Sequence, residues 1–142
     1  MIQLLLESGA NPINALYYAC VYNLLDVATF LLESCSRSIN LNDLYLGRTL
    51  LSTALAQKNQ PLVQLLLDYG ADINKQDALG KTCLFECLST QSMDLVNLCL
   101  EHGANPFILD DSSTSVLHLA ARYGMTDAIK IMSAPPLLDI IN

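Results

Sequence analysis

One short segment of the chain matches part of a nucleotide-binding motif. Gly80-Lys81-Thr82 matches the last three residues of a P-loop. That motif also needs a glycine five residues before its second glycine, and a strand leading into the loop, so that backbone amides can surround the phosphates. Lys75 stands at that position, and the pattern before it predicts a helix that ends at Gly70. We therefore predict that Gly80 makes a turn, that Thr82 caps the next helix, and that Lys81 is a solvated loop residue.

A second group has the residue types of a zinc site. Cys83 and Cys87 are four residues apart and share a helix face, with Cys99 and His102 further along the chain. The three cysteines occupy apolar positions of a repeated pattern, at which Leu50, Ala54 and Leu66 stand one unit earlier. Buried cysteine behaves as a small hydrophobic residue. The sequence therefore predicts buried thiols and no metal site.

Two further features could take part in proton transfer or ion pairing. His118 has the side chain of a general base, but no serine or cysteine nucleophile is placed beside it, so we predict no catalytic residue and no cofactor. The adjacent carboxylates of Asp110 and Asp111 could receive a basic residue of a partner or simply be solvated.

Composition narrows the classes of partner. Seven basic against fourteen acidic residues give a formal charge of −7, which is the wrong sign for contact with phosphate backbones, so nucleic acid is not expected. Hydrophobic residues make up 52% of the chain but occur in short runs, so no membrane span is predicted. The N-terminus lacks the basic region of a secretory signal. Five cysteines, an odd number in apolar patterns, suit a reducing compartment, either the cytoplasm or the nucleus.

The chain repeats itself with a period of 33 residues. Thr49, Thr82 and Ser115 are each followed by an apolar helical stretch and are each 33 residues apart. The segment from 62 to 72 matches the segment from 95 to 105 at the same offset. Periods of this length are typical of solenoid proteins, in which each unit stacks on the next.

Each unit has the pattern of two short helices and an extended loop. In one unit, Cys83, Leu84, Cys87 and Leu88 form one buried stripe, and Leu95, Val96, Cys99 and Leu100 form the next. Ser92 is placed to cap the second helix and Gly103 to end it. Pro61 and Thr126 begin the corresponding helices of two other units.

These features resemble the ankyrin-repeat family, whose unit is about 33 residues long with a T-P-L-H-x-A signature. Residues 115–124, SVLHLAARYG, come closest to the family's T-P-L-H-x-A-A-x-x-G, and residues 70–74, GADIN, match its G-A-D-x-N. The resemblance implies an all-α repeat solenoid and implies that His118 ties neighbouring loops together. Lys58 and Gln91 stand where the family prefers glycine, so we expect strained or reshaped turns there.

The resemblance implies a single ankyrin-repeat domain over residues 1–142. Its expected divisions are a partial repeat at 1–13, repeats at 14–46, 47–79 and 80–112, and a C-terminal repeat, complete or truncated, at 113–142. The loop at residues 39–47 is two residues longer than its counterpart and is unusually apolar, so it should form the longest finger. Both ends of the chain stop within a unit, which suggests a piece of a longer array or ends covered by a partner.

The function that the resemblance implies is a protein-protein interaction scaffold, with no small-molecule substrate. Members of the family usually bind through the finger tips and the adjoining first helices. Carried onto this chain, those positions are Tyr22, Tyr45, Leu46, Arg48, Gln57, Ala78, Leu79, Lys81, Thr90, Asp111, Ser112, Thr114 and Tyr123. Tyr45 and Leu46 could instead fold back onto their own loop. The alternative function is the recruiting fragment of a larger enzyme, such as a ubiquitin-ligase adaptor, a kinase or a bacterial effector, with the chemistry outside these residues.

Overall fold

The computed structural model describes residues 12–35, 37 and 39–133. Within these ranges the regular structure is helical, apart from one isolated bridge between Tyr45 and Arg48. The contacts divide the chain into two compact units, residues 1–72 and 73–142, and each is described by itself. The predicted division into repeats remains a prediction. Residues 1–11 of the expected partial repeat at 1–13, and residues 134–142 of the expected C-terminal repeat, lie outside the described residues.

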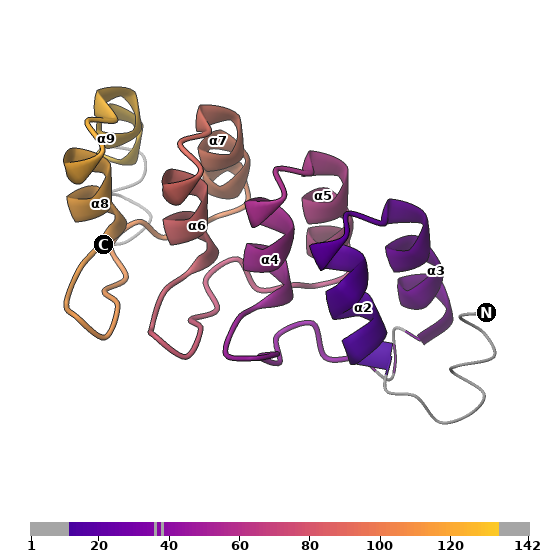
Figure 1. Ribbon diagram of the computed structural model, residues 1–142. Coiled ribbons are helices and arrows are strands. Elements are labelled where there is room, and N and C mark those ends of the chain that lie inside the picture. The colour runs from indigo at the N-terminus through magenta and orange to yellow at the C-terminus, as the bar shows by residue number, and fades with distance from the viewer. Residues whose placement is uncertain (1–11, 36, 38, 134–142) are drawn as a thin grey trace. The chain divides into compact units, whose positions relative to one another are not determined.

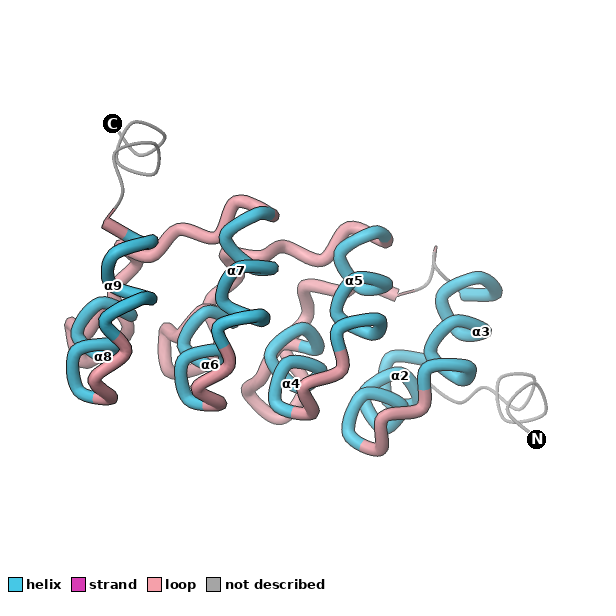
Figure 2. Tube along the Cα trace, turned by 90° about the horizontal axis from the view of Figure 1, so that it is seen from above, coloured by secondary structure: helices cyan, strands magenta, loops and turns pink. Residues whose placement is uncertain are grey.

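Unit 1 contains two antiparallel helix pairs. The first pair is α2 (Pro12–Val21) and α3 (Leu25–Cys35), and the second is α4 (Leu50–Ala56) and α5 (Gln60–Asp68). The first helices α2 and α4 pack against each other, as do the second helices α3 and α5, so that the unit has two layers (Figures 1 and 2). The core between them contains Leu16, Leu31, Leu50, Leu62 and Leu66, all fully buried.

Unit 2 has the same architecture. Its pairs are α6 (Cys83–Ser89) with α7 (Met93–Glu101), and α8 (Val116–Arg122) with α9 (Thr126–Met132). The predicted stripe of α6 is buried throughout, and α7 buries Leu95, Val96 and Cys99 but leaves Leu100 half-exposed. The stripes explain the pairing, since each helix has one apolar face and burying one leucine contributes about 1.5 to 3 kcal/mol.

Side-chain caps begin four of the eight described helices, namely α4, α5, α7 and α8. The Thr49 hydroxyl accepts a hydrogen bond from the Ser52 amide at 3.1 Å, and the Ser92 hydroxyl accepts one from the Leu95 amide at 3.5 Å. Thr82 stands at the equivalent position before α6, but the predicted side-chain cap is wrong. The Phe85 amide donates instead to the Thr82 carbonyl at 3.1 Å, which leaves the buried Thr82 hydroxyl without a partner among the described residues.

The turns between paired helices all contain a residue with positive φ. Lys58 (φ 57°) and Gln91 (φ 56°) adopt this left-handed conformation at the positions where the family resemblance favours glycine. Asn23 and Gly124 occupy the same place in the other two pairs, with φ of 62° and 68°. A non-glycine residue in this region costs about 1 to 2 kcal/mol. The expected strain at Lys58 and Gln91 is therefore confirmed.

Candidate partner-binding surfaces

The first finger loop ends in a two-residue turn that presents a leucine to solvent. Tyr45 and Arg48 exchange two backbone hydrogen bonds, of 2.9 and 3.0 Å, around Leu46 and Gly47. Both central residues have positive φ, 53° at Leu46 and 78° at Gly47, which is the pattern of a type I′ turn. The Leu46 side chain is 77% exposed. The extra length of this loop lies before the tip, where the Asn42 amide donates to the Asn40 side chain at 3.0 Å.

Tyr45 turns in the opposite direction, toward α2. Its ring centroid lies 4.3 Å from that of Tyr17, and Tyr17 in turn contacts Tyr18 edge to face. Partial desolvation, with Tyr18 as the next cause, raises the pKa of Tyr45. Tyr45 is therefore half-buried and packs on its own unit, while Leu46 projects into solvent.

The two finger loops of unit 2 are each held by an aspartate. The Asp77 carboxylate accepts hydrogen bonds from the amides of Leu79 and Lys81 at 2.8 and 3.0 Å. Asp110 makes the same pair of bonds, both of 2.9 Å, with the amides of Ser112 and Thr114. Asp110 therefore stabilises its own loop. This role differs from the two that the sequence analysis considered, which were contact with a basic residue of a partner and simple solvation. The tip between Asp77 and Lys81 exposes Ala78 and leaves Leu79 61% exposed.

Gly80 lies where the two fingers of unit 2 meet. The Asp111 amide donates a hydrogen bond to the Leu79 carbonyl at 3.0 Å, and the Gln76 side chain bonds to the carbonyls of both Gly80 and Leu109. A Cβ atom added to Gly80 would lie 2.8 Å from the Asp111 amide nitrogen and 2.5 Å from its carboxylate. The glycine of the P-loop-like segment is thus required for close packing between two loops, and Lys81 is exposed as predicted.

Side-chain amides form further bonds between successive loops, and sequence reasoning missed them. The Asn42 side chain accepts from the Asp72 amide at 2.7 Å in unit 1, and the Asn74 side chain accepts from the Asn105 amide at 2.7 Å in unit 2. His118, which the resemblance assigns to this task, makes a local contact instead. Its Nδ1 accepts a hydrogen bond of 3.0 Å from the Ser115 amide at the start of its own helix.

The predicted binding residues fall into two groups at opposite ends of the first helices. The finger group lies before the first helices and includes Leu46, Arg48, Leu79, Lys81, Asp111, Ser112 and Thr114. Tyr22, Gln57, Thr90 and Tyr123 instead follow the last residues of α2, α4, α6 and α8. A helix of seven residues separates the two groups by about 10 Å. Their role in binding remains a prediction.

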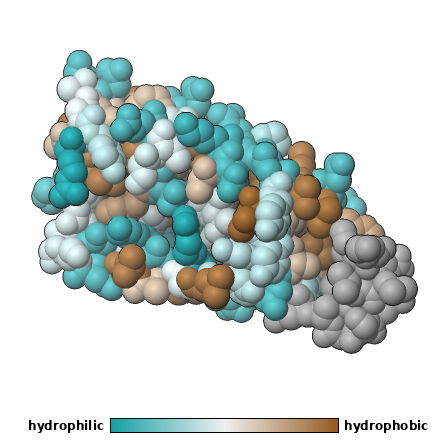
Figure 3. Space-filling model, viewed as in Figure 1, coloured by the Kyte–Doolittle hydropathy of each residue, from teal (hydrophilic) through white to brown (hydrophobic). Residues whose placement is uncertain are grey.

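Apolar side chains at the fingers are set among polar ones. In Figure 3, brown side chains lie on the loop that precedes α4 and over α2 in unit 1, and, separately, on the loop that precedes α6 in unit 2. The exposed leucines Leu46 and Leu79 belong to those two loops. The third finger carries Asp110, Asp111 and Ser112 at the corresponding place.

Cys83, Cys87 and Cys99 are buried as predicted. The Cys87 and Cys99 sulfur atoms lie 3.1 Å apart in the core of unit 2, and the Cys83 thiol donates to the Ile73 carbonyl at 3.2 Å. The hydrogen bond to Cys99 and burial together raise the pKa of Cys87. No group of three histidine, cysteine or carboxylate side chains able to hold a metal ion occurs within the described ranges. Cys35 is the last residue of α3 and is half-exposed.

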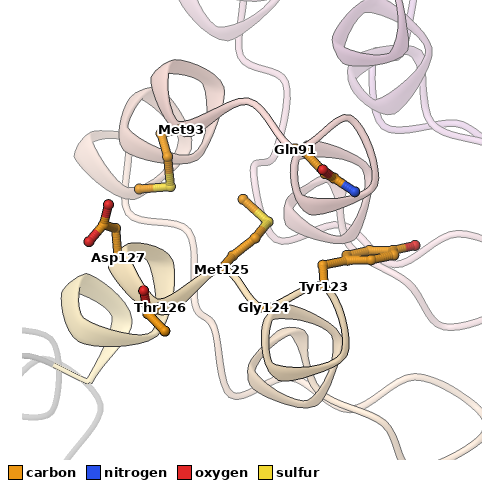
Figure 4. A pocket seen from close by; sticks show the side chains of 7 residues that line it. All are labelled: Gln91, Met93, Tyr123, Gly124, Met125, Thr126 and Asp127. Atoms are coloured by element: carbon orange, nitrogen blue, oxygen red, sulfur yellow. The ribbon is translucent and has the colours of Figure 1, made fainter.

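A pocket in unit 2 was not predicted from the sequence. It has a volume of about 310 Å³ and lies beside the turn from α6 to α7 and the turn from α8 to α9. In Figure 4 the side chains of Met93 and Met125 lie between Asp127 on one side and Gln91 and Tyr123 on the other. The complete lining is Gln91, Met93, Tyr123, Gly124, Met125, Thr126 and Asp127.

Comparison with known protein families agrees with this architecture. A family model described as ankyrin repeats in three copies matches residues 1–77 and again residues 51–137. The chain belongs to the ankyrin-repeat family. Ankyrin repeats are generally protein-interaction modules and typically not catalytic. No curated protein matches the chain as a relative. Across the part that the structure describes, no helix combines the length and the apolar character needed to cross a membrane.

Proposed function

We propose that this ankyrin-repeat chain is a scaffold that binds a partner protein through its finger loops, with the neighbouring first helices contributing to the surface. One observation carries the proposal. Leu46 is held in the left-handed conformation at the tip of a finger and is 77% exposed. That conformation costs a leucine about 1 to 2 kcal/mol, and exposure forgoes the stabilisation that burial of the side chain would provide.

Asparagine or glycine would satisfy the same turn better than leucine does. A strained residue that is also exposed is therefore poorly explained by folding and better explained by contact with another molecule. Leu79 supports the proposal, since it occupies the tip of the next finger and is 61% exposed. The burial of Cys20, Cys83, Cys87 and Cys99 in apolar surroundings supports a reducing compartment, the cytoplasm or the nucleus.

The test uses substitutions that remove the exposed leucines without harming the turns. A partner captured by affinity purification is prepared in pure form, and its affinity is measured by calorimetry against the wild-type, Leu46→Asn and Leu79→Asn chains. Losing one leucine from an interface costs about 1.5 to 3 kcal/mol, which weakens binding by roughly 10- to 100-fold. Asparagine suits positive φ, so Leu46→Asn should fold at least as stably as the wild type.

A matched control is available in the same unit. Leu24 is 46% exposed and lies in the turn between α2 and α3, away from the fingers. It directly precedes α3, a position at which asparagine caps a helix well. Leu24→Asn should leave partner binding unchanged. Equal affinity of the wild-type, Leu46→Asn and Leu79→Asn chains would refute the assignment of binding to the fingers.

A further inference from the structure

Two cysteines face each other in the core of unit 2. Cys87 belongs to α6 and Cys99 to α7, both side chains are fully buried, and their sulfur atoms lie 3.1 Å apart. Reacting atoms that are held about 3 to 3.5 Å apart are already in a near-attack arrangement. The two thiols therefore lie at a distance from which a disulfide bond can close.

The other three helix pairs carry a different combination at the equivalent places. There an alanine of the first helix stands with a longer apolar residue of the second, and all six side chains are buried. The pairs are Ala19 with Leu31, Ala54 with Leu66, and Ala120 with Met132. A single buried cysteine is explained by packing, since cysteine acts as a small hydrophobic residue. Packing does not explain why both positions of one pair hold the residue type whose side chains can join covalently.

We propose that Cys87 and Cys99 form a reversible disulfide when the protein meets hydrogen peroxide, and that this bond braces α6 against α7. The peroxide oxidises one thiol to a sulfenic acid and is itself reduced to water. The neighbouring sulfur then attacks the sulfenic sulfur, which forms the S–S bond. The proton of the attacking thiol and the departing hydroxide leave as a second water. A thiol of low molecular weight reverses the bond by exchange.

Burial determines when this reaction occurs. Both side chains are 0% exposed, so hydrogen peroxide reaches them only when α6 and α7 open locally. Once one sulfur is oxidised, reclosure brings the other thiol against it, and bond formation within the chain is faster than reaction with a second molecule. In a reducing compartment such a bond is transient and reports the oxidant. The inference does not depend on the proposed function, because both sulfurs lie in the core.

The test uses the full chain with Cys35→Ser, because Cys35 is half-exposed and could otherwise join two molecules. The chain is treated with hydrogen peroxide and unfolded, the remaining thiols are blocked with N-ethylmaleimide, and a protease cuts after glutamate. Cleavage at 86 and 101 releases the peptide 87–101, which contains Cys87 and Cys99 and leaves Cys83 outside. Mass spectrometry should find this peptide two hydrogen atoms lighter and free of maleimide, and dithiothreitol should restore it.

The bracing effect is measured by thermal melts. The bond closes a loop whose ends are 12 residues apart, so oxidation should raise the melting temperature by roughly 5 to 10 °C. The matched control combines Cys87→Ala with Cys99→Leu, which restores the combination of Ala54 and Leu66 in unit 1. Peroxide should not raise its melting temperature, and oxidation of methionines is common to both chains. Cys87→Ala alone is a second control that cannot form the bond.

A neighbouring thiol provides the control for position. The Cys83 thiol donates to the Ile73 carbonyl at 3.2 Å, and Cys83→Ser keeps a donor there, so this variant should form the same disulfide. Four results would overturn the inference. They are maleimide on both Cys87 and Cys99 after peroxide, a link from Cys99 to Cys83, a sulfinic acid in place of the bond, and an equal change of melting temperature in the chain with both cysteines and in the control.

Discussion

Substituting Gly80 with alanine tests the close contact between the two fingers of unit 2. An added Cβ would lie 2.8 Å from the Asp111 amide nitrogen, a separation at which one of the two loops must move. Overpacking of this kind costs about 1 to 3 kcal/mol. Gly80 also has φ of +78°, at which alanine costs about a further 1 to 2 kcal/mol. We expect Gly80→Ala to lower the free energy of unfolding by about 2 to 5 kcal/mol.

Gly103 provides a matched control for the backbone part of this cost. Its φ is +86°, close to that of Gly80, but an added Cβ would meet no heavy atom within 4 Å. Gly103→Ala should therefore cost only about 1 to 2 kcal/mol. The effect of alanine on the unfolded chain is common to both variants and cancels in the difference. The steric part of the Gly80 substitution should appear as a difference of about 1 to 3 kcal/mol.

The measurement is urea unfolding followed by far-ultraviolet circular dichroism, with both variants compared at the same slope m. Adding Asp111→Ala to Gly80→Ala should recover only part of the loss, because the substitution removes the carboxylate and keeps the amide nitrogen. Equal destabilisation by Gly80→Ala and Gly103→Ala would refute the reasoning, since the close approach of Asp111 would then contribute nothing.

Three further predictions concern stability and thiol reactivity. Thr49→Val should lower the free energy of unfolding by about 1 kcal/mol because it removes the cap, whereas Thr82→Val should be close to neutral because the Thr82 hydroxyl has no hydrogen-bond partner among the described residues. Thermal melts would separate the two variants. Lys58→Gly should be about 0.5 to 1 kcal/mol more stable than Lys58→Ala, because only glycine relieves the positive φ, and urea unfolding would show it. Iodoacetamide should label Cys35 first in the native chain, because the other four cysteines are buried. Burial also raises the pKa of Cys20 to about 12. Mass spectrometry should detect the first adduct in the wild-type chain and not in Cys35→Ser.

The helix pairs could be predicted because each depends on local periodicity and on caps within one unit. Cys83, Leu84 and Leu88 recur at helical spacing and are buried in α6. The cap at Thr82 could not be judged in the same way. Thr49 and Thr82 are equivalent in sequence, yet the amide that would reach the hydroxyl bonds to the carbonyl of Thr82 instead. A choice between two acceptors on the same residue depends on small changes in the first turn, which the residue types do not determine.

The candidate sites were harder to predict for a different reason. The finger tips follow from the 33-residue period, but the opposite directions of Tyr45 and Leu46 depend on a turn of only two residues. In unit 1 the side chains of Asn23 and Asn59 hydrogen-bond to each other and join the two helix turns. In unit 2, Gly124 and Met125 line a pocket beside the corresponding turns. Such a difference becomes visible only when two turns, far apart in the sequence, are compared in space.

The two surfaces of unit 2 are close enough for one partner segment to reach both. The finger at Thr114 precedes α8, and the pocket residue Tyr123 follows it, so the length of a seven-residue helix, about 10 Å, separates them. An extended chain covers about 3.3 Å per residue, so three or four residues span this distance. A partner segment with three or four residues between two contacting side chains would therefore reach from the finger at Thr114 to Tyr123. The acidic charge of the unit favours a basic segment over a neutral one.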